Sequence, residues 1–475
     1  MPTYRTPGVY VEEISTFPPS VAEVETAIPA FIGYTEKASK IVANDLLNRP
    51  TKIYNFVEYQ QYYGAPEASE IAVALTAAGS TFTAVVEPPV TTYLLYYAVK
   101  MFFDNGGGKC YIVSCGLHTD TIIIGTLTTG LTGGLAAVAL EDEPTLLVCP
   151  DALKLDTGYD TMAQAMLAQC GSLKDRFAIL DLFAGSTVQT AADLLKNRAR
   201  VGINNLKYGA LYYPDLRSSF NHYVKPDEKN VAVTGVPENP PPLPLPSALE
   251  SVTLAMLGDP TNQKRWNTAA YDAVKTALLN HFIVVPPSGA VAGVYAAVDS
   301  SRGVWKAPAN VSLAGVVEPM VRLDNSHQDE LNVDATTGKS INALRAFSGK
   351  GTLVRGARTL AGNDNEWRYV PVRRFFNMVE ESVKKSSYWA VFEPNDANTW
   401  VKVRGMIENY LTQKWREGAL AGATTKDAYF VRCGLGTTMN AQDILEGRMN
   451  VEIGMAVVRP AEFIFLKFSH KLQTS

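Results

Sequence analysis

The feature that most constrains the fold is a regular alternation of short apolar strands and amphipathic helices in the first half of the chain. Residues 91–103 carry apolar side chains at helical spacing, and three glycines from Gly106 stop this helix before a buried strand at 110–113. The same alternation of helix and strand recurs in the segments 145–181 and 191–213. Such alternation predicts a mostly parallel α/β sheet with helices on its faces.

The chain begins with a segment that cannot build a core. Residues 1–24 contain four prolines around a β-prone run at 9–11, so we interpret them as an extended arm. The first buried strand is expected at 30–33, where a short apolar run ends at a glycine. We therefore predict an N-terminal linker arm at 1–24 and an α/β domain at 25–345.

Two changes of composition divide the rest of the chain. The stretch PPPLPLP continues neither a helix nor a strand, so we expect a surface insertion at about 224–247, a loop or a hinge. Beyond residue 345 the sequence becomes rich in arginine, and residues 397–419 have the pattern of a long helix. We predict a second domain of α+β class at 346–458, followed by a strand arm at 459–475.

The C-terminal arm has nothing after it in the chain with which to pair. Its residues alternate between two faces, as a strand requires. A terminal strand exposes backbone donors and acceptors that the sheet edge of another chain can satisfy. We therefore take the strand residues of both arms as candidate contacts between subunits. These residues are Val9, Tyr10, Val11, Phe463, Ile464, Phe465, Leu466 and Phe468.

Charge and hydropathy exclude several classes of partner. The net charge of −4 gives no basic field that would hold nucleic acid or an anionic membrane surface. No apolar run is long enough to cross a bilayer, and the first residues lack the pattern of a signal peptide. Five cysteines without a C-x-x-C pair indicate reduced thiols in the cytoplasm.

Motifs for cofactors are incomplete. The run from Gly106 to Lys109 lacks the glycine and hydroxyl residue of a phosphate-binding loop, because the required positions hold Phe103 and Cys110. We interpret these glycines as a helix stop. The five histidines have no spacing that would let them share a metal ion. We therefore expect no cofactor and no metal.

Ser288 is the strongest candidate for catalysis. It begins a small-residue helix after a buried strand, which is where subtilisin-like proteases display their nucleophile. Such a serine needs a histidine base and an orienting acid. The surrounding protease patterns are absent, and Asp181 is an ordinary aspartate at a strand end. We predict a subtilisin-like sheet without a catalytic triad and no enzyme; the alternative is a degenerate serine hydrolase.

Two groups of basic residues leave a choice between a structural and a binding role. Interleaved carboxylates favour a salt-bridged protein surface over a phosphate or RNA clamp for the first group. That group is Arg355, Arg358, Arg368, Arg373 and Arg374. The second group forms the charged side of the helix at 400–417, either a solvated face or a docking face. That group is Lys402, Arg404, Lys414 and Arg416.

The chain resembles contractile tail sheath proteins. Three long stretches are similar to the C-terminal domain of that family: ARTLAGNDNEWRYVPVRRFFNMVEES, VFEPNDANTWVKVRGMIENYLTQKWREGALAG and GRMNVEIGMAVVRPAEFIFLKFSHKL. The stretches TPGVYVEEI and VAEVETAIPAFIGYTE resemble its N-terminal arm and first strand. These stretches resemble the sheaths of extracellular contractile injection systems, such as antifeeding-prophage-like particles, more than those of long-tailed phages.

This resemblance implies a homo-oligomer of stacked six-fold rings around an inner tube, with arms exchanged between neighbours and a contraction that drives the tube. It also implies baseplate and terminal cap proteins as partners, paralogous sheath chains, and no nucleic acid or membrane insertion. Assembly would occur in the bacterial cytoplasm, as part of a phage-tail-like particle released from the cell. We expect Lys402, Arg404, Lys414 and Arg416 to face the tube. The alternative is a type VI secretion sheath, which is normally split into two chains.

Overall fold

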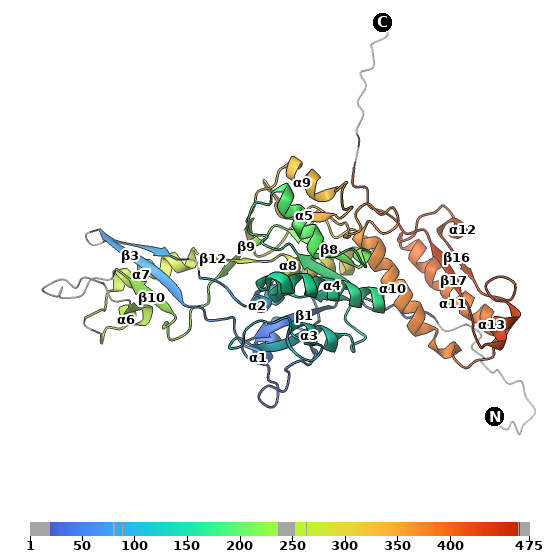
Figure 1. The fold of residues 1–475 in the computed structure, drawn as a ribbon, viewed down its shortest axis with the longest axis horizontal. Coiled ribbons are helices and arrows are strands. Elements are labelled where there is room, and N and C mark those ends of the chain that lie inside the picture. Colours follow the sequence, from blue (N-terminus) through green and yellow to red (C-terminus); the bar gives the residue numbers. More distant parts are fainter. Residues whose placement is uncertain are drawn as a thin grey trace, which may run out of the picture. The chain divides into compact units, whose positions relative to one another are not determined.

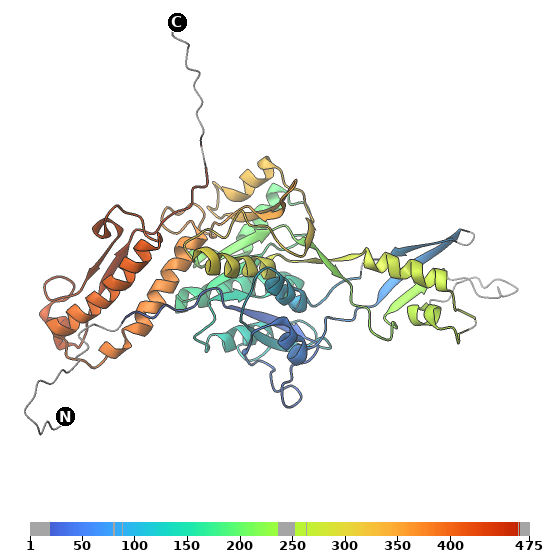
Figure 2. The same cartoon turned by 180° about the vertical axis from the view of Figure 1, so that it is seen from behind.

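The computed structural model describes residues 20–78, 81–87, 89–235, 252–262, 264–463 and 465 (Figures 1 and 2). The chain divides into two compact units. The larger unit comprises residues 25–377 and 459–475, and the smaller comprises 1–24 and 378–458.

An eight-stranded sheet forms the centre of the larger unit. Its order is β15 (Gly351–Val354), β14 (Ile341–Phe347), β8 (Gly209–Tyr213), β7 (Phe177–Asp181), β6 (Leu146–Val148), β1 (Pro29–Thr35), β5 (Cys110–Leu117) and β2 (Thr51–Ile53). The six inner strands are parallel, and β15 and β2 pair antiparallel at the edges. This arrangement confirms the predicted parallel sheet. Counted along the chain, the parallel strands follow the order 2-1-3-4-5-6, as in doubly wound folds of the flavodoxin type.

Helices cover both faces of this sheet (Figures 1 and 2). Phe31 of β1 belongs to the core cluster on one face, whereas its neighbours Ala30 and Ile32 belong to the cluster on the other. The helices α1 (Phe56–Tyr63), α2 (Leu95–Asp104) and α8 (Ser288–Arg302) contribute to the first cluster. The helices α3 (Gly130–Val138), α4 (Asp156–Leu173), α5 (Ala191–Arg200) and α9 (Asn325–Asn332) contribute to the second. Burial on both faces explains why the strands are continuously apolar.

The small residues of α8 permit an unusually close approach to α2. A Cβ atom at Gly289 would lie 2.3 Å from the carbonyl oxygen of Ala98, and one at Gly293 would lie 2.5 Å from that of Phe102. Any side chain at these two glycines would therefore push the helices apart.

A second, smaller sheet in the larger unit was not predicted. Its order is β11 (Val252–Thr253), β10 (Val231–Thr234), β3 (Ile71–Ala78) and β4 (Thr81–Val86). The helices α6 (Leu254–Gly258) and α7 (Thr268–Leu279) cover one face and close a separate core. The insertion predicted at about 224–247 is thus corrected, because Val231 and Val233 alternate inward and pair with β3. Residues 236–251 lie outside the described part of the chain.

A three-stranded sheet, β12-β9-β13, lies beside the carboxyl edge of the central sheet. It consists of β12 (Phe282–Val285), β9 (Leu216–Asn221) and β13 (Val316–Pro319). The buried strand expected before Ser288 is therefore present as β12, but it is half-buried and pairs antiparallel with β9. Short 3-10 helices complete the larger unit: η1 (Pro150–Lys154) and η2 (Leu206–Tyr208).

The smaller unit is mainly helical. The helix α10 (Val370–Ser386) enters it at residue 378, and η3 (Tyr388–Ala390) and α11 (Ala397–Arg416) follow. The remaining elements are α12 (Thr425–Ala428), β16 (Tyr429–Arg432), α13 (Ala441–Leu445) and β17 (Glu452–Met455). The boundary predicted at 345/346 is wrong, since it falls inside β14, which pairs in parallel with β8 of the central sheet. The arginines Arg355, Arg358, Arg368, Arg373 and Arg374 all lie in the larger unit, so the arginine-rich composition does not mark the change of unit.

Candidate functional site

Two buried carboxylates lie where the parallel strands of the central sheet end. Asp181, the last residue of β7, accepts a hydrogen bond at 2.7 Å from the backbone N–H of Ser288, the first residue of α8. Asp151, just beyond β6, accepts bonds from the backbone N–H groups of Tyr34 and Leu94 at 2.7 and 2.6 Å. Doubly wound sheets bind ligands outside this edge, so the edge is the first candidate for a catalytic site.

The edge holds a serine and an acid without a base. Ser288 and Asp181 are both buried, and neither makes a hydrogen bond to a histidine in the part of the chain that the structure describes. In a catalytic triad the acid holds a histidine. Here Asp181 holds the backbone of Ser288 instead. The arrangement fixes the start of α8 against the sheet.

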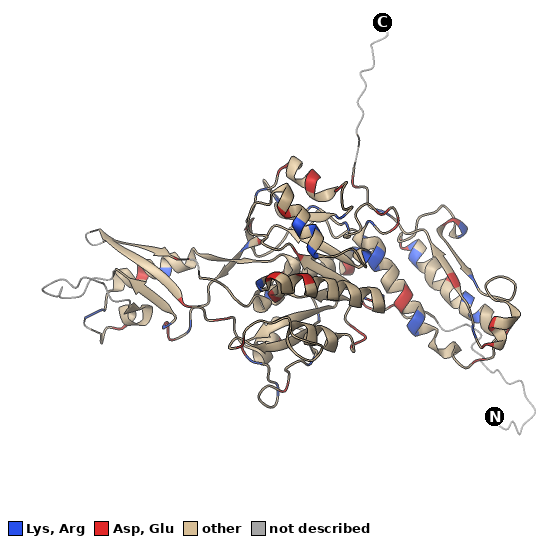
Figure 3. Ribbon diagram, in the orientation of Figure 1, with Lys and Arg blue, Asp and Glu red and all other residues tan. Residues whose placement is uncertain are grey.

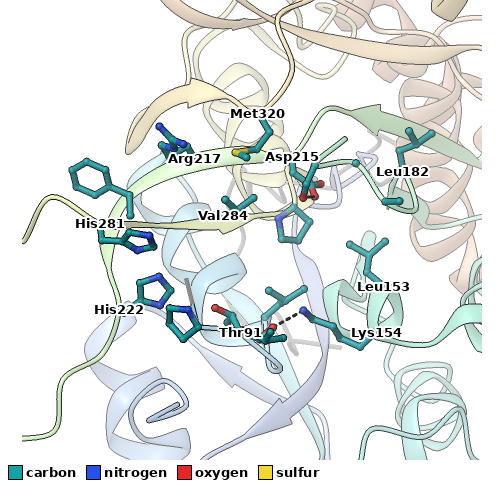
Figure 4. A pocket seen from close by; sticks show the side chains of 18 residues that line it. Thr91, Leu153, Lys154, Leu182, Asp215, Arg217, His222, His281, Val284 and Met320 are labelled. Carbon is teal, nitrogen blue, oxygen red and sulfur yellow. Dashed lines mark hydrogen bonds between the residues drawn. The ribbon is translucent and has the colours of Figure 1, made fainter. Parts of the chain in front are cut away.

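A cavity of about 490 Å³ opens beside this edge (Figure 4). On its wall, the Lys154 ammonium donates to the carbonyl oxygen of Thr91, and the Ser186 hydroxyl donates to Asp215 at 2.6 Å. Burial raises the pKa of Asp215 to about 6. The lysine and the carboxylate therefore already have protein partners, and the wall presents no serine paired with a histidine among the described residues.

The buried carboxylate of Asp181 makes the stability of the larger unit depend on pH. Burial raises the pKa of Asp181 to about 7, well above the ordinary value near 4. The folded chain therefore holds this proton more tightly than the unfolded chain. The stabilising contribution is complete below the unfolded pKa and is lost as pH rises through the folded pKa.

We expect Asp181→Asn to raise the unfolding temperature at pH 8 and to leave it nearly unchanged at pH 4. The amide oxygen keeps an acceptor for the Ser288 N–H but carries no charge, and at about 1.4 kcal/mol per pKa unit the gain at pH 8 is on the order of a few kcal/mol. Thermal unfolding at the two pH values measures it. Asp329→Asn, at an exposed position of α9, is the control. An equal shift at both pH values would contradict the assignment.

The glycine run after α2 has a structural role. Gly106 adopts a φ of +92°, a left-handed conformation that ends the helix, as predicted. The ammonium of Lys109 lies 2.8 Å from a carboxylate oxygen of Glu143 and also pairs with Glu25. The lysine that would reach a phosphate is therefore held by two carboxylates.

Folding brings together two histidines that are far apart in the sequence. The ring centroids of His222 and His281 lie 5.1 Å apart at the cavity wall. Burial, with the neighbouring His281, lowers the pKa of His222 to about 4. Within the described residues, no group of three or more histidine, cysteine, aspartate or glutamate side chains is placed to hold a metal ion. His470 lies outside those residues.

Three arginines of the cluster, Arg358, Arg373 and Arg374, are buried, whereas Arg368 is half-buried and Arg355 is exposed. The guanidinium of Arg374 lies 3.0 Å from a carboxylate oxygen of Asp299, and both side chains are almost fully buried. Arg373 donates to Asn377 at 2.8 Å and lies over the ring of Trp367 at 4.3 Å. A role in protein ion pairs is thus confirmed for Arg374, but its partner is not among the interleaved carboxylates that we expected. Two buried, occupied guanidinium groups cannot clamp RNA or phosphate.

The last residues of the predicted N-terminal arm are fixed along α10. The backbone N–H groups of Ala22 and Val24 donate to the hydroxyls of Ser386 and Ser382, each at 3.0 Å. The two serines lie one helical turn apart, so they match alternate residues of an extended chain. Residues 9–11 of the arm itself lie outside the described part of the chain.

Lys414 does not belong to an exposed basic face, which corrects our expectation. Its side chain is 6% exposed, and its ammonium pairs with the carboxylates of Glu23 and of Glu417, the latter at 2.7 Å. Glu23 precedes the larger unit by two residues. Lys414 therefore helps to fix the root of the N-terminal arm inside the smaller unit.

The other three basic residues of α11 do not form one stripe. At about 100° per residue, Arg404 lies roughly 160° around the helix from Lys402, whereas Arg416 lies within roughly 40° of it. Lys402 and Arg416 are exposed, and Arg404 pairs with Glu408 at 3.7 Å. Figure 3 shows basic and acidic residues mixed along α10 and α11. Only Lys402 and Arg416 remain candidates for a common docking face.

The start of the C-terminal arm rests on one side chain. The carboxylate of Glu462 accepts bonds from the guanidinium of Arg358, with the shortest contact at 2.6 Å. Phe463 and Phe465 are 64% and 85% exposed. Ile464, Leu466 and Phe468 lie outside the described residues.

The smaller unit has a two-stranded sheet with open edges. The strands β16 and β17 pair antiparallel from Tyr429 with Met455 to Arg432 with Glu452. Among the described residues, no further strand adds to this sheet. Phe430, on β16, is 41% exposed. Such an edge presents unpaired backbone groups and is a template for strand addition.

Comparison with known proteins agrees with these features. Residues 127–360 match the model of the phage tail sheath protein central domain, and residues 362–471 match that of the phage tail sheath C-terminal domain. Among curated proteins, the tail sheath protein of Vibrio phage KVP40 is 29% identical over 131 residues, which cover 27% of this chain and 19% of that protein. The matched part thus spans about a fifth of that relative's length.

Two solved structures match over the whole chain. The helical sheath of the anti-feeding prophage in its contracted state is 31% identical, with 99% of this chain and 100% of that chain covered and a TM-score of 0.65. The sheath complex of PVC, an extracellular contractile injection system, in its contracted state is 30% identical, with 99% of each chain covered and a TM-score of 0.65.

The chain belongs to the contractile tail sheath family. Within that family it is similar from end to end to sheaths of extracellular contractile injection systems. Neither the hydrolase nor the type VI alternative is favoured by these matches.

Proposed function

We propose that this sheath subunit polymerises as stacked six-fold rings around an inner tube and that contraction of the polymer drives the tube into a target. The observation that carries the proposal is the end-to-end similarity to two sheaths whose structures are of contracted assemblies. A fold that matches over 99% of the chain supports the same mode of assembly.

Both ends of the chain supply the joints of this polymer. In this proposal each arm pairs as a strand with a neighbouring subunit, and the edges of β16 and β17 are the places where it adds. Arm and acceptor edge are different surfaces, so the contact is heterologous and propagates as an open helix. An extended arm can also remain attached while the folded units of neighbouring subunits slide.

Contraction requires two packings of the same subunits that differ in free energy. In our proposal, contacts with the inner tube hold the extended packing until a trigger releases them. Polar contacts suit this role, because they can break without exposing apolar surface to water. The exposed pair Lys402 and Arg416 on α11 is our candidate for these contacts.

Further partners and the cellular place follow from the same proposal. We include baseplate and terminal cap proteins and paralogous sheath chains as partners, and we place assembly in the bacterial cytoplasm before release of the particle. No helix of the described chain has the length and apolar character to cross a membrane. We also propose that the central sheet is of subtilisin type and inactive; the buried Ser288 at the start of α8, held through its N–H by Asp181, supports this.

Electron microscopy of the overexpressed protein tests the proposal. We expect hollow tubules with cross-striations in negative stain, since the subunits need no template to satisfy one another's strand edges. A monodisperse globular protein at the same concentration would contradict it. Labelling of Ser288 by a serine-reactive phosphonate would separately contradict the inactive site.

A further inference from the structure

One carboxylate connects the C-terminal arm to the body of the larger unit. The guanidinium of Arg358 donates to both oxygens of Glu462, from Nε at 3.0 and 3.2 Å and from Nη2 at 2.6 Å. Asn332 and Tyr369 donate to the same carboxylate at 2.9 and 3.2 Å. Four donor atoms from three side chains therefore converge on Glu462. Charge-assisted pairs of this forked geometry are strong and directional.

Arg358 is itself held rigidly. Its side chain is 4% exposed, and its backbone N–H and carbonyl both bond the side chain of Asn342, each at 2.8 Å. Its remaining guanidinium nitrogen donates to the carbonyl oxygens of Asn332 and Gly362 at 3.3 and 3.4 Å. The socket for Glu462 thus exists as part of the folded unit and does not depend on the arm.

The residues around Glu462 are not held in this way. The chain leaves the smaller unit at Val458, whose N–H donates to the carbonyl of Ala419, and joins the larger unit at Arg459. Among the described residues from Arg459 to Phe463, Glu462 alone takes part in hydrogen bonds. The side chains on either side of it, Ala461 and Phe463, are exposed. A single side chain fixes where the arm departs.

We propose that Glu462, seated in the Arg358 socket, is the anchor that sets the departure point of the C-terminal arm and positions it for a neighbouring subunit. The inference deepens the proposed function and rests on it, because a positioned arm matters only if another subunit receives it. An arm that leaves from a fixed point loses less conformational freedom when it pairs. It also searches a smaller volume, which raises its effective concentration at the acceptor edge.

Glu462→Gln tests the anchor, since it keeps the size of the side chain and removes its charge. We expect the subunit to fold normally, because Glu462 lies on an exposed segment, and to need about tenfold more protein to form tubules. The matched control is Glu318→Gln, which removes the charge of another arginine-paired glutamate, 3.0 Å from Arg217 in the same unit. Thermal unfolding and quantitative pelleting of tubules are the measurements.

A second readout does not depend on assembly. A nitroxide label at Phe463→Cys reports local mobility in the monomer fraction, and the five native thiols are buried. We expect Glu462→Gln to sharpen its spectrum and Glu318→Gln to leave it unchanged. An unchanged spectrum, or tubules formed at the wild-type concentration, would overturn the anchor. If no variant and no wild-type protein forms tubules, the proposed function fails, and the spectra still decide whether Glu462 holds the arm.

Discussion

Subunits that lack residues 1–16, or that end at Pro460, are expected to fold and to remain unpolymerised. Each truncation removes residues that we assign to the joint with a neighbour, and none of the described core residues of either unit lies in the removed segments. A net gain of about 1 kcal/mol for each backbone hydrogen bond makes a strand of four residues worth several kcal/mol per joint. Because about 1.4 kcal/mol is a factor of ten in affinity, the concentration needed for polymerisation would rise by orders of magnitude.

Sedimentation and negative-stain microscopy at matched concentrations measure this loss, with circular dichroism to confirm the fold. A matched control replaces residues 236–249 with a short Gly-Ser linker. This change affects a similar length of chain but leaves both ends intact. We expect this control to form tubules. Normal tubules from either truncation would mean that the arms do not join the subunits.

The parallel sheet could be predicted because each of its strands satisfies a local rule. Strands such as Phe177–Asp181 are buried on both faces, so they are short, apolar and followed by amphipathic helices. The helix Ala191–Arg200 begins the segment 191–213, in which we predicted a helix followed by a strand. Its polar face and the capping box at Thr190 mark its limits locally.

The small sheet escaped prediction because its pairing is not local. Ile71, Val73 and Leu75 alternate inward on β3, and this alternation was a usable signal that we did not apply. Their partners Val231 and Val233 come after four strands of the central sheet, β5 to β8, in the sequence and lie beside a proline-rich run. Secondary-structure propensity is a local property, so it cannot predict that such distant segments pair. Only the core that they enclose together shows that they share a face.

The candidate site also has one part that the sequence could not predict and one part that it could. The ion pair of Arg358 with Glu462 joins residues 104 positions apart, and no spacing rule predicts such a pair. The misassignment of Lys414 was avoidable: it lies on the same side of α11 as Met406, Ile407 and Tyr410, all of which are buried. A helical projection would have separated it from Lys402 and Arg416.

Reversing the charges of the exposed pair, by Lys402→Glu with Arg416→Glu, is expected to leave folding intact and to abolish filled, extended particles. Both side chains are exposed, so the free energy of unfolding should change by less than about 1 kcal/mol. In a particle, every subunit would present two wrong charges to the tube, and like charges across an interface cost several kcal/mol. The extended packing would lose its restraint, which leaves empty or prematurely contracted sheaths.

Co-expression of the variant with the tube and baseplate proteins, followed by microscopy, distinguishes these outcomes. The control reverses two lysines of the larger unit, Lys229→Glu with Lys264→Glu, which are exposed and change the net charge equally. Raised salt should also weaken the wild-type contact, since the screening length between exposed charges, about 8 Å at physiological ionic strength, shortens as the salt concentration rises. Extended, filled particles from the α11 variant would show that the tube is held elsewhere. If the α11 variant forms tubules without an inner tube and the control variant does not, then Lys402 and Arg416 belong to the surface that contacts the tube and separates from it on contraction.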